Sequence, residues 1–503
     1  MSTKALQAFQ SFDDRLRDLG LALVVLLSRL PFLGPGAGND NDGWFLVNAA
    51  REIAATGRYT TSRFPGYPVQ EWLASLVARA GGGPREMNLL SALAAAGTAF
   101  AFARLLRRLS ARDVSLAALA CVWVPAAYVA SVSAMDYLFA LAFVLAAAHA
   151  RLSGRAWLAG AWLGLAVGAR LTSAVLLPVV LLLPPPSDKP RDSLRPWLGV
   201  SALTALIGAA CYLPAYARYG WRFLSFTDPL GTGSSPLDFL TGLFHLDRLP
   251  FPPALVAGQA TALLWGIPGT LLLAAAFAAG ALARPAATAR ALPHAAPRVL
   301  YASGLAIGLE LLLYLRLPHD EGYLLPAVPF TLLLAAACAP RAWFRAACLA
   351  MIVSPFVLGV DVVPPKKGVE PATRSPLVVS RAAGSYTVVL DVLRGPLLQD
   401  HDKRERAETI VSRVLAARDT LPARTLLFAG VLCAELTERA PQDRAHPWYT
   451  DYLLERDLRD SLARGVPVLL LPGARERVVH VAGYDPVRTG ARALFPEDAS
   501  SPR

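Results

Sequence analysis

The sequence contains few charged residues and few cysteines. Asp, Glu, Lys and Arg together make up 17% of its 503 residues, against about 25% in typical soluble domains. This shortage of charge excludes a soluble enzyme. The five cysteines have neither the spacing of a disulfide framework nor that of a zinc site. The sequence has no GxGxxG or Walker loop, which argues against a nucleotide-binding domain.

Long apolar segments make up most of the chain. Hydrophobic residues account for 54% of the sequence and the mean hydropathy is +0.42, values typical of a polytopic α-helical membrane protein. A helix of about 20 apolar residues crosses a hydrocarbon core of about 30 Å. The sequence predicts about eleven transmembrane helices, near residues 18–35, 87–106, 114–132, 135–150, 156–169, 171–184, 197–217, 255–283, 299–316, 322–339 and 344–361.

Basic residues follow every second predicted span and indicate the orientation of the chain. These residues include Arg151, Arg155, Arg195 and Arg298. The positive-inside rule places such loops in the cytoplasm, so we expect a cytoplasmic N terminus and a first span that serves as an anchor. The net charge of +12 then reflects topology and anionic headgroups rather than nucleic-acid binding. The segments expected on the other side are 36–86, 218–254, 317–321 and everything beyond residue 362.

A domain boundary is predicted at VVPPKKGVEPATRSP, residues 362–376, where prolines and charges end the last span. Residues 1–362 form the predicted transmembrane domain, and 363–503 a small soluble α/β domain on the extracytoplasmic side. The strand-like segments SYTVVLDV, RTLLFAGV and VPVLLLPG alternate with helical segments. This alternation predicts parallel strand pairing.

The first outer loop, within residues 36–86, carries an acidic stretch directly after the first span. Asp42 is followed at helical spacing by Val47, Ala50 and Ile53, which predicts an amphipathic helix on the membrane surface with Asp42 near its N-terminal end. A carboxylate there can simply cap the helix, or it can do chemistry. Asp40 and Asp42 could also bind a divalent cation.

The same loop continues into FPGYP, residues 64–68, and then into an apolar helix through Trp72. Prolines and Gly66 favour extended and turn geometry here. The segment is either a re-entry turn with interfacial Tyr67 and Trp72, or the wall of a lipid-facing pocket.

In this layout the chain resembles the GT-C superfamily of polyprenyl-phosphate-sugar-dependent glycosyltransferases. That superfamily includes protein O-mannosyltransferases and bacterial aminoarabinose transferases of lipid A, and PGYP resembles a bacterial branch of it. The resemblance covers residues 1 to 340 and implies a GT-C-like membrane domain. It is carried by Asp42, by PVQEW at 68–72, by GLAVGARLTSAVLLPVV at 164–180 and by LPHDEGYLLPAVPF at 317–330.

The resemblance implies roles for the charged residues. Asp42 matches the family's first acidic position and would be the general base. Gly43 stands where relatives have a second acid, so either Asp40 supplies the missing charge or the site uses one carboxylate only. Arg170 matches the basic residue that faces the donor phosphate. Gly66 replaces a lysine of some relatives, and Arg63 or Arg58 would take the role of that lysine. The further candidates for the phosphate site are Arg63, Arg58 and Arg316, and those for the substrate pocket are Tyr67, Gln70, Trp72, Asp136 and Tyr323.

The chemistry expected of such a site is inverting sugar transfer. A polyprenyl-phosphate donor needs a cation near the departing phosphate and a base near the acceptor hydroxyl. No metal ion is required, although Asp40 and Asp42 leave a divalent cation open. The expected partners are a polyprenyl-phosphate sugar lipid, a glycan, lipid or protein acceptor and membrane lipids, without nucleic acid.

The expected location is the bacterial inner membrane. Two other classes compete with the transferase: a transporter or flippase of polyprenyl-linked glycans, and a polysaccharide polymerase or ligase. Transporters favour inverted repeats and paired interrupted helices, which the sequence does not display. His319, Asp320 and Glu321 form a charged cluster that we expect to be solvated.

Overall fold

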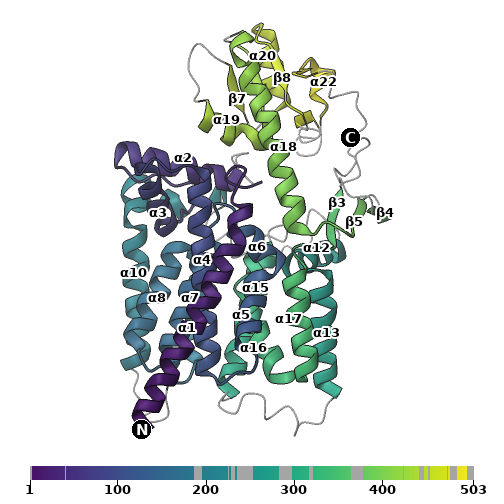
Figure 1. Cartoon of the computed structure of the whole chain (residues 1–503). Helices are drawn as coiled ribbons and strands as arrows, with labels where there is room; N and C mark the ends of the chain where they lie inside the picture. The colour runs from purple at the N-terminus through teal and green to yellow at the C-terminus, as the bar shows by residue number, and fades with distance from the viewer. Residues whose placement is uncertain are drawn as a thin grey trace.

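The structure is a computed structural model in which a bundle of helices carries a smaller α/β unit at one end (Figure 1). We call the end that bears the α/β unit the outer end, and the opposite end, where the N terminus lies, the inner end. The described residues are 3–39, 41–185, 195–224, 226–227, 233–234, 253–282, 297–316, 321–363, 378–383, 386–422, 424–440, 447–450, 454–472, 474–475 and 484–495.

The bundle is that of a polytopic helical membrane protein. Three of its described helices, α4 (Pro84–Arg108), α10 (Arg195–Tyr219) and α15 (Pro297–Arg316), contain segments long and apolar enough to cross a membrane. The total of eleven crossings stays a prediction. The remaining bundle helices include α1 (Thr3–Arg29), α7 (Tyr137–Leu152), α8 (Ala156–Ala169), α9 (Leu177–Leu182), α16 (Ala327–Cys338) and α17 (Arg341–Val353).

Two spans that the sequence predicts as continuous helices are interrupted in the structure. Residues 114–132 form α5 (Val114–Trp123) and α6 (Pro125–Ser131), which are bent by 70° relative to each other. Pro125 accounts for this break, because it lacks an N–H and clashes with the preceding turn. Residues 255–283 form α12 (Pro253–Trp265) and α13 (Ile267–Leu282), separated by Gly266 at φ +73°.

The predicted break between the spans at 156–169 and 171–184 is present and places Arg170. The helix α8 ends at Ala169, Arg170 is extended, and the 3-10 helix η2 (Leu171–Leu176) leads into α9. Gly164 keeps α8 close to α10, because a Cβ atom there would lie 2.6 Å from the Cβ of Ile207. Small residues at the contact between two membrane helices let the helices approach closely. The end of α8 is therefore held firmly, with Arg170 at the outer end.

Two helices of the first outer loop, α2 (Asn41–Thr56) and α3 (Pro68–Arg79), lie at the outer end (Figure 1). The prediction of a helix that starts beside Asp42 is confirmed, since Asp42 lies in the first turn of α2. The fold requires glycine at position 43, because a Cβ atom there would collide with the carbonyl oxygen of Ala37.

The C-terminal part contains two sheets. The first, β3-β5-β4, is antiparallel, whereas the second, β7-β6-β8-β9, is parallel. Parallel pairing is thus confirmed for 424–431 and 466–473 and is wrong for 385–392, because a two-residue connection from β4 to β5 permits only a hairpin. The strands are β3 (Gly359–Val363), β4 (Val378–Ala383), β5 (Tyr386–Asp391), β6 (Leu426–Phe428), β7 (Trp448–Thr450), β8 (Val468–Leu470) and β9 (Arg492–Ala493).

The α/β unit is anchored to the bundle by α18 (Pro396–Ala417) and α19 (Cys433–Arg439). Arg404 of α18 is buried and donates hydrogen bonds to the carbonyl oxygens of Val132 and Phe32, each at 3.1 Å. On α19, Glu438 pairs with Arg51 of α2. These contacts hold α18 beside the helices that form the candidate site.

Candidate functional site

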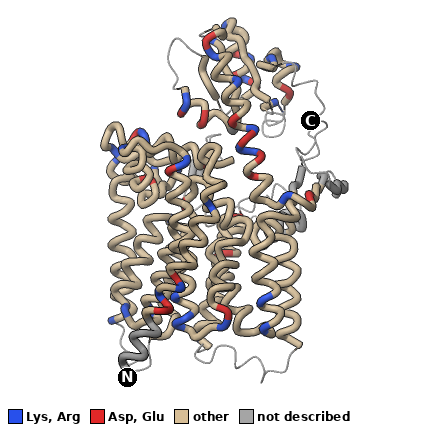
Figure 2. The backbone as a smooth tube through the Cα atoms, viewed as in Figure 1, with Lys and Arg blue, Asp and Glu red and all other residues tan. Residues whose placement is uncertain are grey.

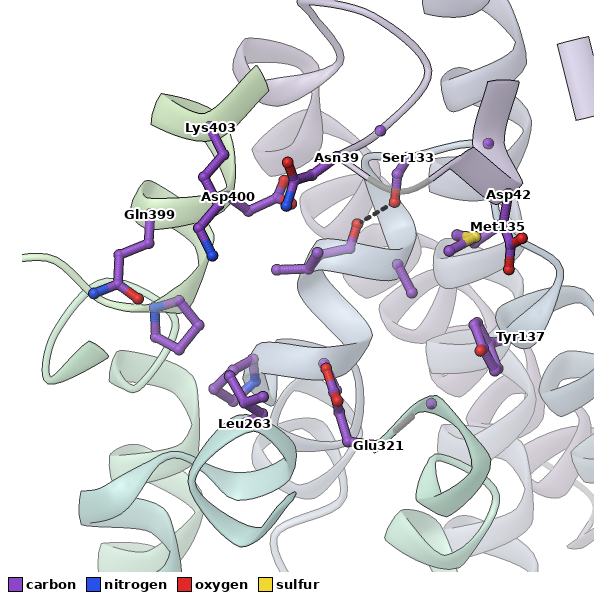
Figure 3. A pocket seen from close by; sticks show the side chains of 18 of the residues that line it. Asn39, Asp42, Ser133, Met135, Tyr137, Leu263, Glu321, Gln399, Asp400 and Lys403 are labelled. Atoms are coloured by element: carbon purple, nitrogen blue, oxygen red, sulfur yellow. Dashed lines mark hydrogen bonds between the residues drawn. The ribbon is translucent and has the colours of Figure 1, made fainter. Parts of the chain in front are cut away.

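A cleft of about 420 Å³ opens at the outer end, between the first outer loop, α6 and α18. Figure 3 shows Asp42 and Tyr137 on one side of it, with Asp400 and Lys403 of α18 on the other. Its walls come from segments that are far apart in sequence: the first outer loop, 125–137, Leu263, 321–325, Val360 and α18. Apolar residues that line the cleft include Pro125, Ala126, Val129, Ala130, Leu263 and Leu325.

Two interruptions of the bundle helices lie against this cleft. Pro125 at the α5–α6 break lines it, as does Leu263 close to the break at Gly266. Irregular backbone at membrane depth is tolerated where it faces a cavity rather than lipid. The breaks are therefore consistent with a site built into the bundle.

A row of alternating charges runs from the edge of the cleft into the bundle. Asp42 pairs with Arg63, Arg63 lies 3.1 Å from Asp136, and Asp136 lies 2.6 Å from Arg170. The side chains of Asp42 and Arg63 are 28% and 22% exposed, whereas those of Asp136 and Arg170 are 2% and 6% exposed. Asp136 is thus a buried carboxylate shared by two guanidinium groups.

Three tyrosines surround the inner part of this row. The guanidinium carbon of Arg170 lies 4.1 Å from the ring centre of Tyr137, 4.5 Å from that of Tyr323 and 5.9 Å from that of Tyr67. Arg63 donates a hydrogen bond of 2.9 Å to the Tyr67 hydroxyl. Burial raises the pKa of Tyr67 against the opposing effect of both arginines, so its phenol stays neutral.

Glu71 holds the loop that presents Arg63 and Tyr67. Its carboxylate is completely buried and accepts hydrogen bonds from the Tyr59 hydroxyl, from the Ser62 N–H and hydroxyl at 2.7 Å each, and from the Tyr67 N–H at 3.1 Å. Burial raises the pKa of Glu71, and these hydrogen bonds oppose the shift. The loop geometry therefore depends on one internal carboxylate.

The structure brings together six of the predicted site residues and separates others from them. Arg58 is exposed, and Trp72 stacks on Tyr59, with 6.1 Å between ring centres, rather than on a residue of the charge row. Gln70 is buried, and its Nε2 atom has no hydrogen-bond partner. Asp40 and the side chain of Arg316 lie outside the described residues. The six that converge are Asp42, Arg63, Tyr67, Asp136, Arg170 and Tyr323.

Several residues at the site did not emerge from the sequence as candidates. Tyr137 directly follows Asp136 and could have been found from that neighbourhood. Glu321 lines the cleft, where we had expected a solvated loop. The α18 residues Asp400 and Lys403 had no local signal, because only the tertiary fold brings them to the first outer loop.

The residues described here form no cluster of three or more His, Cys, Asp or Glu arranged for a metal ion. The alternative of a divalent cation at Asp40 and Asp42 involves a residue outside the described part of the chain. It is therefore still a prediction.

Comparisons with known proteins give no family assignment. No protein-family model and no curated protein matches the sequence. The crystal structure of ArnT from Cupriavidus metallidurans bound to undecaprenyl phosphate aligns with 14% identity and a TM-score of 0.40, covering 95% of this chain and 89% of that one. Its apo structure aligns with 15% identity and a TM-score of 0.41, covering 95% and 97%. Similarity at this level carries no argument about activity.

Proposed function

We propose that this protein is an inverting membrane glycosyltransferase that moves a sugar from a polyprenyl-phosphate donor to an acceptor hydroxyl at the outer end. The observation that carries the proposal is the charge row Asp42–Arg63–Asp136–Arg170 at a cleft with an apolar wall. The charges suit a phosphate and a reacting hydroxyl, and the apolar wall suits the lipid part of the donor. The resemblance to the GT-C superfamily supports the same reaction.

The donor phosphate would meet Arg63 first. Arg63 is the more exposed of the two arginines and lies next to the cleft residue Asp42. Arg170 lies behind it, where it holds Asp136 and adds a second positive charge. A planar guanidinium can contact two phosphate oxygens at once and stabilise the charge that develops as the phosphate departs.

The acceptor hydroxyl would be activated by Asp42. In a single displacement, the hydroxyl proton moves to the Asp42 carboxylate as the oxygen attacks the anomeric carbon from the face opposite the phosphate. The bond between that carbon and the phosphate oxygen breaks, and its electron pair leaves with the polyprenyl phosphate. The configuration at the anomeric carbon is inverted.

A transfer assay with synthetic polyprenyl-phosphate sugars tests this scheme. Asp42→Asn keeps the size of the side chain but cannot take up a proton at neutral pH, so we expect turnover to fall by about 10²- to 10⁴-fold. Glu52→Gln is the matched control, because it removes an exposed carboxylate from the same helix. Near-normal turnover of Asp42→Asn would assign the base to Asp40, Asp136 or another residue.

A lipid-linked glycan transporter is the second candidate, and the helix breaks at Pro125 and Gly266 favour it. Interrupted helices around a central site are typical of transporters. Measurements in detergent distinguish the two functions, because a micelle has no two sides between which a lipid could be transported. Sugar transfer by the purified protein in micelles would support the transferase, whereas movement of donor across vesicles without transfer would support the transporter.

A further inference from the structure

A second pocket, of about 870 Å³, lies at the inner end of the bundle. The helix α7 connects the two sites: it begins beside Asp136 in the charge row and ends at Leu152 next to this pocket. Its 16 residues rise by about 24 Å along the helix axis. The pocket is therefore separate from the cleft. Its lining includes four arginines, from the ends of α7, α8, α10 and α15, namely Arg151, Arg155, Arg195 and Arg298.

The arginines of this inner pocket have no acidic partner in the described part of the chain. No described Asp or Glu lines the pocket, and none forms an ion pair with these four residues. Elsewhere at the inner end the situation differs, because Asp113 pairs with both Arg341 and Arg345. Figure 2 shows how Lys and Arg mark the inner ends of the helices.

Membrane topology explains three of the four arginines but not the fourth. Arg155, Arg195 and Arg298 are exposed, as expected of cytoplasmic arginines that reach into water. Arg151 is only 3% exposed, and its Nε atom is buried without a hydrogen-bond partner. A buried guanidinium without a counter-charge is costly. An anion in the pocket would supply the missing counter-charge.

The apolar part of the pocket indicates what kind of anion this is. Trp157 and Trp197 line it and are 68% and 44% exposed, and Leu158 beside them is 40% exposed. Tryptophan is enriched at the boundary between headgroups and acyl chains. A ligand that fits both halves of the pocket has an anionic head and an apolar tail.

We propose that the inner pocket binds an anionic glycerophospholipid. Its phosphate contacts Arg151 and is surrounded at the rim by Arg155, Arg195 and Arg298, and its acyl chains lie along Trp157 and Leu158. Basic pockets between membrane helices on the cytoplasmic side recognise anionic headgroups in this way. The site is independent of the reaction proposed for the outer cleft.

The experiment measures binding of phosphatidylglycerol to the full-length protein in a non-ionic detergent. Native mass spectrometry counts retained lipid molecules, and the thermal unfolding midpoint is recorded with increasing phosphatidylglycerol, phosphatidylcholine or inorganic phosphate. We expect one tightly retained phosphatidylglycerol and a rise in the midpoint with this lipid alone. Arg151→Gln should weaken its binding by on the order of tenfold or more.

Two further variants keep the test decisive. The double variant Arg155→Gln/Arg195→Gln leaves the buried Arg151 in place and changes only exposed side chains, so it should fold normally and still bind phosphatidylglycerol less tightly. Arg345→Gln is the matched control at the inner end and should bind as the unmodified protein does. Equal retention of both lipids, unchanged binding in the pocket variants, or an equal rise with inorganic phosphate would each overturn the proposal.

Discussion

The charge row beside the outer cleft and the inner pocket both contain arginines, but only the charge row supplies carboxylates for them. In the charge row, Arg63 and Arg170 share Asp136, and Arg63 also contacts Asp42. In the inner pocket, Arg151 is as buried as Arg170 yet has no acidic partner among the described residues. A site whose charges are already matched can position a ligand and exchange partners during a reaction, whereas a site with unmatched charge is suited to holding an anion permanently.

The largest expected effect concerns the shared acid of the cleft. Asp136→Asn removes the negative charge between two guanidinium groups, one of which is almost completely buried. Breaking a buried ion pair by removing one partner costs about 3–5 kcal/mol. We therefore expect a marked fall in the thermal unfolding midpoint of the purified protein, together with loss of transfer.

The matched control for this prediction lies at the inner end. Asp113 is also shared by two arginines, Arg341 and Arg345; its own side chain is 8% exposed, but theirs are 53% and 48% exposed. Solvent screens the exposed partners, so Asp113→Asn should lower the midpoint less than Asp136→Asn does. Similar losses in both variants would mean that burial does not set the strength of these pairs.

The sequence predicted much of the site because its parts carry local signals. Helical spacing after Asp42 predicted the start of α2, and short motifs pointed to Tyr67, Asp136, Arg170 and Tyr323. Arg63 was only one of two substitutes for a missing lysine, yet it lies between both carboxylates. Its position depends on the buried Glu71, whose partners come from several positions in a turn that no periodicity describes.

Other features depend on contacts between distant segments and had no signal in the sequence. The α18 residues of the cleft follow Asp42 by more than 350 positions, and Arg404 fixes them through carbonyl oxygens rather than through a recognisable motif. The spans at 114–132 and 255–283 looked continuous because hydropathy does not register a bend, although Pro125 and Gly266 mark the two breaks locally. From the sequence, the arginines of the inner pocket are explained by membrane topology alone, because the sequence does not show which of their side chains are buried.

Glu435 of the α/β unit is a buried acid whose charge is incompletely matched. The pH dependence of its contribution to stability measures what such a charge costs. Burial raises the pKa of Glu435 in α19 from 4.5 to about 7, and the negative charge of Glu408 adds to the rise, whereas the partner Arg439, at 3.3 Å, opposes it. The folded state therefore binds the proton more tightly than the unfolded state. The contribution of Glu435 to stability should be greatest below pH 4.5, fall as the pH rises to 7 and then level off, by about 3 kcal/mol in all.

Unfolding of the full chain across this pH range tests that expectation. Glu435→Gln mimics the neutral form, so the difference in unfolding free energy between it and the unmodified protein should grow from pH 4.5 to pH 7 in favour of the variant. A difference that does not change with pH would show that Arg439 matches the charge completely.

The smallest expected effect separates the two arginines of the cleft by their exposure. If Arg63 is the first contact of the donor phosphate, Arg63→Ala should weaken binding of a polyprenyl phosphate without a sugar by about 2 kcal/mol, or tens-fold in affinity. Arg63→Lys should restore part of this loss, since it returns the charge without the planar guanidinium. Arg170→Ala should weaken lipid binding as well. Both variants remove one partner of Asp136, but Arg170 is 6% exposed and Arg63 is 22% exposed, so the unfolding midpoint should fall further in Arg170→Ala than in Arg63→Ala. Binding measured by fluorescence quenching, with the fold of each variant verified, distinguishes the two. Unchanged lipid binding in both alanine variants would move the phosphate site away from the charge row.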